Sequence, residues 1–330
     1  MVPQPIGLFT DGLRQLPRAA AFAWAAEHGI GQVELGTGGF SSAPHLDLDE
    51  LGNDRGVESL LRDARNAGVE LAALNCSGNQ LFPDVIDGGS ADDRTLRRTL
   101  VAADALGVER VVCMSGCAVA GPDDRVRPAF LPVEWLPQDH GRVAWQWRER
   151  LVPYWEGLLE FASERAPGVA ICLELDPGQT VFTPRGFLRL RNAFGDAAGQ
   201  LGVNLDPSHL FWQQMDPLRA IRALGPLVRY AHAKDVVLDE EATATNGLLE
   251  GDQEGVSTPA DRSYRYATAG DGHDVAWWAA FSVALAEVGY DGPLSIEWED
   301  AAADPFGSIE RAVALLRTAT SHGQKARHER

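Results

Sequence analysis

The chain has 330 residues, of which 45% are hydrophobic and 23% are charged, which is the composition of an ordinary globular protein. Its formal net charge of -18 repels phosphate backbones, so nucleic acid is excluded as an expected partner. No apolar stretch reaches the roughly 18 residues of a membrane helix. The N-terminus, MVPQPIGLFTDGL, lacks the basic and apolar regions of a signal peptide. We therefore expect a cytoplasmic protein that does not bind membranes.

Eight short apolar runs predict buried strands, and they lie at 5–9, 32–36, 70–75, 110–115, 170–175, 202–206, 228–233 and 294–298. Amphipathic stretches between them predict helices. This alternation predicts a single-domain (β/α)8 TIM barrel over residues 1–322, followed by a polar tail at 323–330. Two strand-to-helix connections are long, at 116–140 and 236–273, and in a barrel they lie at the face that carries active sites. The second is expected to be a lid or an oligomer contact.

The four cysteines, Cys76, Cys113, Cys117 and Cys172, lie mostly within apolar runs. Their spacing matches neither a disulfide framework nor a C-x-x-C metal site. We expect buried, reduced thiols.

Charged residues stand at the ends of the last four predicted strands, where burial is costly unless a charge is paired or binds a metal. They are Glu174 and Asp176, then Asp206 and His209, then His232, Lys234 and Asp235, and finally Glu297, Glu299 and Asp300. Since side chains alternate along a strand, one residue from each strand can face a common centre. Three carboxylates and an imidazole suit one divalent ion, with Mn²⁺ expected first and Mg²⁺, Co²⁺ or Zn²⁺ as alternatives. The competing interpretation is a set of ion pairs at the barrel rim.

Five segments carry a family resemblance: ALNCSGNQLFP (73–83), CLELDPGQTVFTP (172–184), VNLDPSHLFWQQMDP (203–217), YAHAKDV (230–236) and LSIEWED (294–300). In these segments the sequence resembles the xylose isomerase-like barrel superfamily. That group includes sugar phosphate isomerases and epimerases, inosose dehydratase and C-glycoside deglycosidase subunits. The resemblance implies that Glu174, Asp206, His232 and Glu297 bind the metal and that His209 contacts substrate. Sugar epimerases of this superfamily carry another glutamate six residues after the first ligand, where this chain has Thr180.

The resemblance implies proton abstraction next to the carbonyl of a sugar, keto-sugar or keto-glycoside, leading to isomerisation or epimerisation. The alternative is β-elimination by a lyase of the same fold, a dehydratase or a C-glycoside deglycosidase. The expected catalytic residues are Glu297, His209 and Lys234. The expected substrate-binding residues are His209, Lys234, Arg265, Trp212 and Trp298. Each also has a structural interpretation: a loop cap for His209, ion pairs for Lys234 and Arg265, and core packing for the tryptophans.

Two other classes of protein compete with the sugar enzyme. An endonuclease IV-like nuclease would need three metal ions and more histidines than the eight present. A non-catalytic sugar-binding barrel would not need the complete ligand set. We therefore expect a small sugar or glycoside as the partner. We also expect a homo-oligomer, with a small second subunit as a further option.

Overall fold

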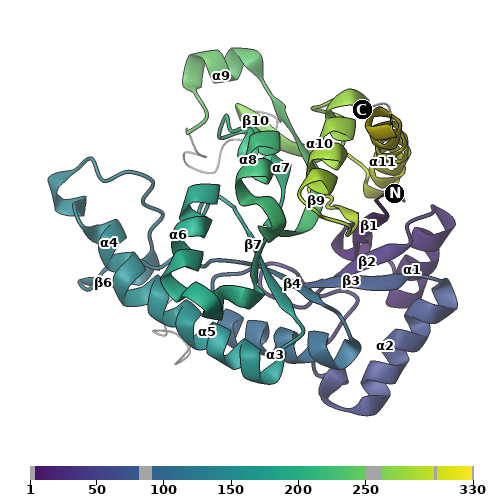
Figure 1. Cartoon of the computed structure of the whole chain (residues 1–330), viewed down its shortest axis with the longest axis horizontal. Coiled ribbons are helices and arrows are strands. Elements are labelled where there is room, and N and C mark those ends of the chain that lie inside the picture. The colour runs from purple at the N-terminus through teal and green to yellow at the C-terminus, as the bar shows by residue number, and fades with distance from the viewer. Residues whose placement is uncertain (1–3, 82–90, 250–261, 301–302, 329–330) are drawn as a thin grey trace. The chain divides into compact units, whose positions relative to one another are not determined.

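The computed structural model describes residues 4–81, 91–249, 262–300 and 303–328, and Figure 1 labels its helices and strands. The eight strands are β1 (Ile6–Phe9), β2 (Gln32–Gly36), β3 (Glu70–Asn75), β4 (Arg110–Met114), β7 (Ala170–Glu174), β8 (Leu201–Leu205), β9 (Val228–Leu238) and β11 (Leu294–Ile296). They are hydrogen-bonded in the order β9-β11-β1-β2-β3-β4-β7-β8, and β8 also pairs with β9. The parallel eight-stranded TIM barrel predicted from the apolar runs is therefore confirmed.

Helices alternate with these strands, as the amphipathic stretches predict. They are α1 (Arg18–Glu27), α2 (Asp54–Ala67), α3 (Ala91–Leu106), α4 (Arg142–Gln146), α5 (Val152–Arg165), α6 (Pro184–Phe194), α7 (Pro207–Phe211), α8 (Pro217–Leu224), α9 (Glu240–Asn246), α10 (Val275–Glu287) and α11 (Pro305–His328). Contacts divide the chain into two compact units. Unit 1 comprises 1–34, 63–72 and 205–330, and unit 2 comprises 35–62 and 73–204.

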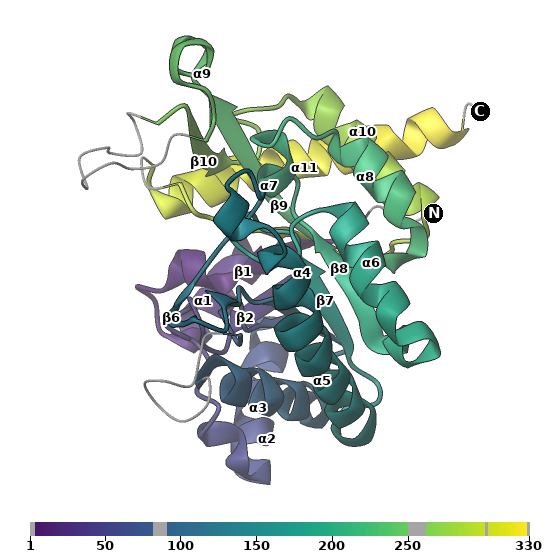
Figure 2. The same ribbon diagram turned by 90° about the vertical axis from the view of Figure 1, so that its left-hand side faces the viewer.

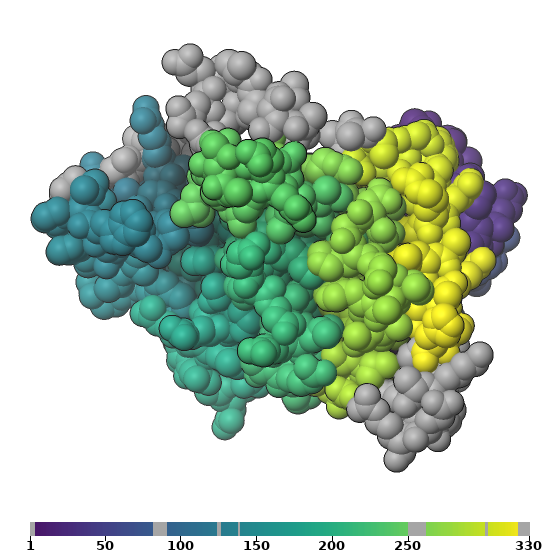
Figure 3. All heavy atoms as spheres, turned by 90° about the horizontal axis from the view of Figure 1, so that it is seen from above, coloured from purple at the N-terminus to yellow at the C-terminus, as the bar shows by residue number. Residues whose placement is uncertain are grey.

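Unit 1 packs its last helices closely. Helix α10 contacts both α8 and α11, and Figure 3 shows these three helices as neighbouring bands on one face. The side chains of Trp278, Phe281 and Leu285 on α10 are fully buried. Large apolar side chains on one helix thus supply much of the core of this unit.

Unit 2 contains a short antiparallel hairpin, β5 (Val119–Gly121) and β6 (Asp124–Pro128), inside the predicted connection 116–140. Helix α5 contacts α3 and α6, and the views in Figures 1 and 2 agree on the position of α3 beside α5. The indole of Trp155 is fully buried and donates a hydrogen bond to the carbonyl oxygen of Ser115 at 3.1 Å. This bond ties α5 to the residue that follows β4.

The connection 236–273 differs from the predicted loop. Strand β9 continues to Leu238, five residues beyond the predicted end at 233, and an additional strand, β10 (Tyr264–Thr268), pairs with it antiparallel. Strand β9 extends this far because β10 forms hydrogen bonds with backbone groups of β9 that lie beyond the neighbouring barrel strands. Residues 250–261 lie outside the described residues, so the predicted lid is untested there. At the other end of the chain, α11 continues to His328 and includes most of the predicted tail.

Burial accounts for the chemistry of the cysteines. All four are free and buried. Burial raises the pKa of Cys76 and of Cys117 to about 11, above the ordinary value of 9.0. The prediction of buried, reduced thiols agrees with this arrangement. Among the described residues, the helices also include none that is both long and apolar enough to cross a membrane.

Thiol titration tests this packing. We expect a disulfide reagent at pH 8 to react slowly with the native protein and to label all four cysteines once guanidinium unfolds it. The reason is that the thiolate is the reactive form, and burial both blocks the reagent and disfavours ionisation. Rapid labelling of the native protein would contradict the buried positions.

Candidate functional site

Asp206 stands where β8 turns into α7. It is the N-cap of the helix, and its Oδ1 accepts a hydrogen bond from the backbone N–H of Ser208 at 2.8 Å. Pro207 occupies the first helical position, where its missing N–H costs nothing. The cap fixes the carboxylate, whose Oδ2 lies 3.0 Å from Nζ of Lys234. Local capping chemistry thus holds one candidate ligand in place.

His232 lies fully buried on β9 between two acidic groups. Its Nε2 is 3.1 Å from both carboxylate oxygens of Glu34, and its Nδ1 is 3.2 Å from Oε2 of Glu297. A neutral imidazole that donates from Nε2 to Glu34 presents the lone pair of Nδ1 to the opposite side. This is the arrangement of a metal-binding histidine whose second nitrogen is held by a carboxylate.

Glu34 is one of the site residues that the sequence did not single out. It is fully buried on β2 and also accepts a hydrogen bond from the hydroxyl of Ser295 at 2.8 Å. Burial, followed by the charge of Glu34, raises the pKa of Tyr230 well above its usual value. A glutamate inside the apolar run QVELG was the available signal, because such a charge needs a partner.

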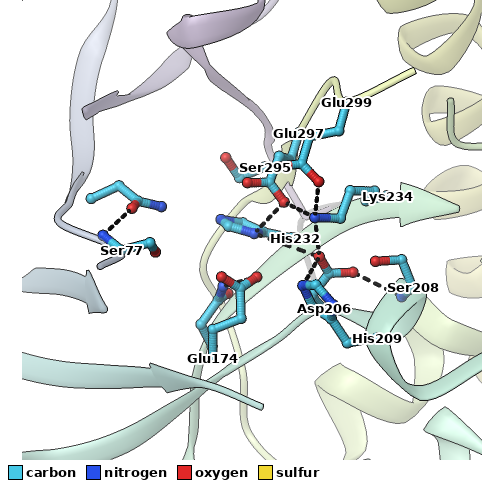
Figure 4. Close-up of polar contacts among 12 residues, drawn as sticks. Ser77, Glu174, Asp206, Ser208, His209, His232, Lys234, Ser295, Glu297 and Glu299 are labelled. Atoms are coloured by element: carbon cyan, nitrogen blue, oxygen red, sulfur yellow. Dashed lines mark hydrogen bonds and ion pairs between the residues drawn. The ribbon is translucent and has the colours of Figure 1, made fainter. Parts of the chain in front are cut away.

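Lys234 lies two residues after His232 and is 2% exposed. Its Nζ is 2.6 Å from Oε2 of Glu297 and 2.8 Å from Oε2 of Glu299. Together with Asp206, three acids therefore surround one ammonium group. Figure 4 shows His232 and Lys234 of β9 converging with Asp206 and Glu297.

Glu174 is a further buried acid. It ends β7, is 2% exposed, and is the register partner of Asn204, two residues before Asp206. The side-chain amide of Asn204 donates to its Oε1 at 3.3 Å. Candidate ligand atoms of Glu174, Asp206, His232 and Glu297 all lie within 4.8 Å of one another, and all four residues are buried. Three buried carboxylates and an oriented imidazole fit a divalent cation, because such a donor set carries excess negative charge.

His209 faces the same cluster from α7. Its Nε2 is 3.4 Å from Oδ2 of Asp206, and its Nδ1 is 3.0 Å from the hydroxyl of Tyr266. Tyr266 belongs to the additional strand β10, and its ring also lies under Nζ of Lys234 at 4.8 Å. Nothing in the sequence singles out Tyr266, because its position beside His209 depends on the pairing of β10 with β9, which the sequence does not reveal.

The remaining predicted substrate-binding residues have packing roles in the structure. Trp212 stacks on Tyr264 with ring centroids 4.8 Å apart. Arg265 donates to Oδ2 of Asp300 at 3.1 Å, which is the ion pair considered as its alternative. A Cβ on Gly12 would lie 3.2 Å from Cβ of Trp298, so the base of that side chain packs near the first turn after β1. Their roles toward a substrate stay predictions.

Asp235 organises the segment that follows β10. Its Oδ2 accepts the backbone N–H groups of Gly270, Gly272 and His273, and its Oδ1 lies 2.6 Å from Nδ1 of His273. Gly272 is required here, because a Cβ would lie 2.1 Å from the carbonyl oxygen of Val236. The aspartate after Lys234 is therefore structural.

Comparison with known families agrees with this geometry. Residues 22–319 match the model of the xylose isomerase-like TIM barrel family. The chain belongs to this family. Within the curated proteins, it is 40% identical over 317 residues to the uncharacterized protein YfiH of Bacillus subtilis, covering 94% of this chain and 98% of YfiH.

Solved structures of the family share its fold. A xylose isomerase domain protein from Planctomyces limnophilus matches with a TM-score of 0.63 and 17% identity, covering 98% of this chain and 99% of that one. A xylose isomerase-like TIM barrel protein from Mycobacterium smegmatis, solved in complex with magnesium, matches with a TM-score of 0.60 and 16% identity, covering 98% and 100%. Other matches include an L-ribulose 3-epimerase and a probable 3-DHS dehydratase from Bacillus anthracis.

Removal of the charge of Glu34 tests the orientation of His232. We expect Glu34→Gln to lower the affinity for a divalent ion by roughly 10-fold or more, the usual effect of losing a carboxylate partner of a ligating histidine. Titration calorimetry with Mn²⁺ measures it. Glu70→Gln is the matched control, since Glu70 is exposed at the start of β3. Equal affinity in both variants would contradict the role of Glu34.

Proposed function

We propose that this chain is a divalent-metal-dependent enzyme that removes a proton next to the carbonyl of a sugar, keto-sugar or keto-glycoside. The observation that supports it most is the buried His232, held by Glu34 on one nitrogen and facing Glu297 with the other. If Nε2 of His232 donates to Glu34, the lone pair of Nδ1 is available to a cation held beside Glu297 and Asp206.

Glu174, Asp206, His232 and Glu297 would hold the ion, with Mn²⁺ preferred and Mg²⁺, Co²⁺ or Zn²⁺ as alternatives. The Mycobacterium smegmatis structure in complex with magnesium supports a divalent metal for the fold. A bound ion would supply Lewis-acid polarisation of the carbonyl oxygen.

The protein's own side chains account for proton movement. When the hydroxyl of Tyr266 accepts a hydrogen bond from Nδ1–H of His209, the Nε2 of His209, 3.4 Å from Oδ2 of Asp206, carries the lone pair that can accept a proton. Glu297 is the second candidate base. Lys234 forms ion pairs through Nζ with Glu297 and Glu299 and would orient a substrate oxygen.

The proposed reaction type depends on Thr180, which stands where sugar epimerases carry a second glutamate. Thr180 cannot act as a base, so a symmetric pair of glutamates is not available from that position. Isomerisation or epimerisation through His209 and Glu297 is the first proposal. Elimination by a dehydratase or deglycosidase is the second, and the fold occurs both in sugar 3-epimerases and in a probable dehydratase. The proposed substrate is a small molecule, while the oligomeric state, any second subunit and cytoplasmic localisation stay predictions.

Metal dependence is the first test of this function. We expect purified protein to hold about one divalent ion per chain, and activity to be lost with EDTA and restored by Mn²⁺. Incubation with a panel of ketoses in D₂O should show metal-dependent exchange of an α-proton by NMR. Exchange or turnover at an undiminished rate in metal-free protein would overturn the proposal.

His209 can be tested separately from metal binding. We expect His209→Asn to keep its affinity for Mn²⁺ and to lower kcat by roughly 10²-fold or more, the usual contribution of a general acid–base group. His28→Asn is the control, because His28 lies at the end of α1. Normal turnover by His209→Asn would assign the proton transfer to Glu297.

A further inference from the structure

A cavity of about 430 Å³ lies wholly within unit 2. Its walls come from three segments: residues 129–134 after the hairpin, the region of α4 around 143–147, and residues 179–189 leading into α6. The last segment begins five residues after Glu174, at the carboxyl end of β7. The volume falls within the range of about 300–1,000 Å³ that is usual for small-molecule sites.

Aromatic side chains form the apolar part of this cavity. Phe130 and Phe182 meet edge to face with ring centroids 5.0 Å apart, and Trp147 is 6% exposed. Phe130 remains 37% exposed, although it is large and apolar. Rings arranged in this way favour a flat apolar ligand, because offset and edge contacts between rings are attractive.

Two polar groups in the lining need hydrogen-bond partners. Gln179 is only 5% exposed, and within the described part of the chain neither its Oε1 nor the Oγ1 of Thr180 has one. Buried polar atoms are nearly always hydrogen-bonded, so a ligand hydroxyl would satisfy them. Thr180 is also the position where sugar epimerases carry a glutamate, and a neutral, smaller side chain leaves room for a ligand there.

The cavity is positively charged, in contrast to the chain as a whole at -18. Arg185 and Arg189 line it, and neither forms an ion pair within the described residues. The guanidinium of Arg189 lies 3.9 Å from the ring centroid of Trp147. The lining also contains one acid, Glu134, whose Oε1 accepts the backbone N–H of Val143 at 2.8 Å, so the two arginines outnumber it. The N-terminus of α6, capped by Thr183, adds a partial positive charge.

We propose that this cavity binds a planar, hydroxylated ring that carries an acidic group. The aromatic walls hold the ring, Gln179 and Thr180 bind its hydroxyl, and the two arginines bind the anion, since guanidinium groups recognise carboxylates and phosphates. This site requires no metal, so it stands or fails independently of the proposed function.

Titration calorimetry with 4-hydroxybenzoate as the probe tests the site, using 4-hydroxybenzamide as the neutral comparison. We expect the acid to bind with and without EDTA, and the amide to bind roughly tenfold more weakly or worse, as expected when a charge-assisted hydrogen bond is lost. Absence of binding by the acid at millimolar concentration, or equal affinity for acid and amide, would overturn the proposal.

Variants assign the binding to this cavity. We expect the double variant Arg185→Gln/Arg189→Gln to abolish the preference for the acid, and Gln179→Leu to weaken binding of both probes. The matched control is Arg219→Gln/Arg222→Gln, which removes two charges from α8 in unit 1. Unchanged affinity in the first double variant, or an equal loss in the control, would place the binding elsewhere. Thermal melting confirms that each variant is folded.

Discussion

The burial of negative charge at the carboxyl ends of the barrel strands is the constraint on which the rest of the structure depends. Asp206, Glu297 and Glu34 are all buried, and Glu174 is 2% exposed. Carboxylates in such positions are tolerated only when cations or donors compensate them. His232 and Lys234 supply part of that compensation from one strand, β9. A divalent cation would supply the rest, and for that reason the site is interpreted as a metal centre.

Two features of unit 1 beside β9 support these buried charged residues. The additional strand β10 extends the pairing of β9 and brings Tyr266 to His209 and Lys234. Asp235 then fixes the segment after β10 through three backbone N–H groups. Consecutive side chains of one strand therefore point to opposite faces, with Lys234 in the acidic cluster and Asp235 supporting the next turn.

The cavity of unit 2 differs in character from the acidic cluster. The chain has Thr180 where sugar epimerases have a glutamate, and the space beside it is lined by aromatic rings and arginines. Within the described residues neither Arg185 nor Arg189 forms an ion pair, so the lining offers positive charge to an anion. A ligand that is flat and acidic suits that environment better than an uncharged sugar alone.

The sequence by itself determined the barrel, and its family resemblance singled out the four candidate ligands. Continuous apolar runs predicted the strands closely, because strands buried on both faces must be apolar, and the charged residues that interrupt their ends were conspicuous. Only the tertiary structure decided which side chains contact these residues. Glu34 and His232 are 198 residues apart in the chain, and Tyr266 reaches His209 only because β10 pairs antiparallel with β9. Such contacts depend on register and strand order, which periodicity and composition do not encode.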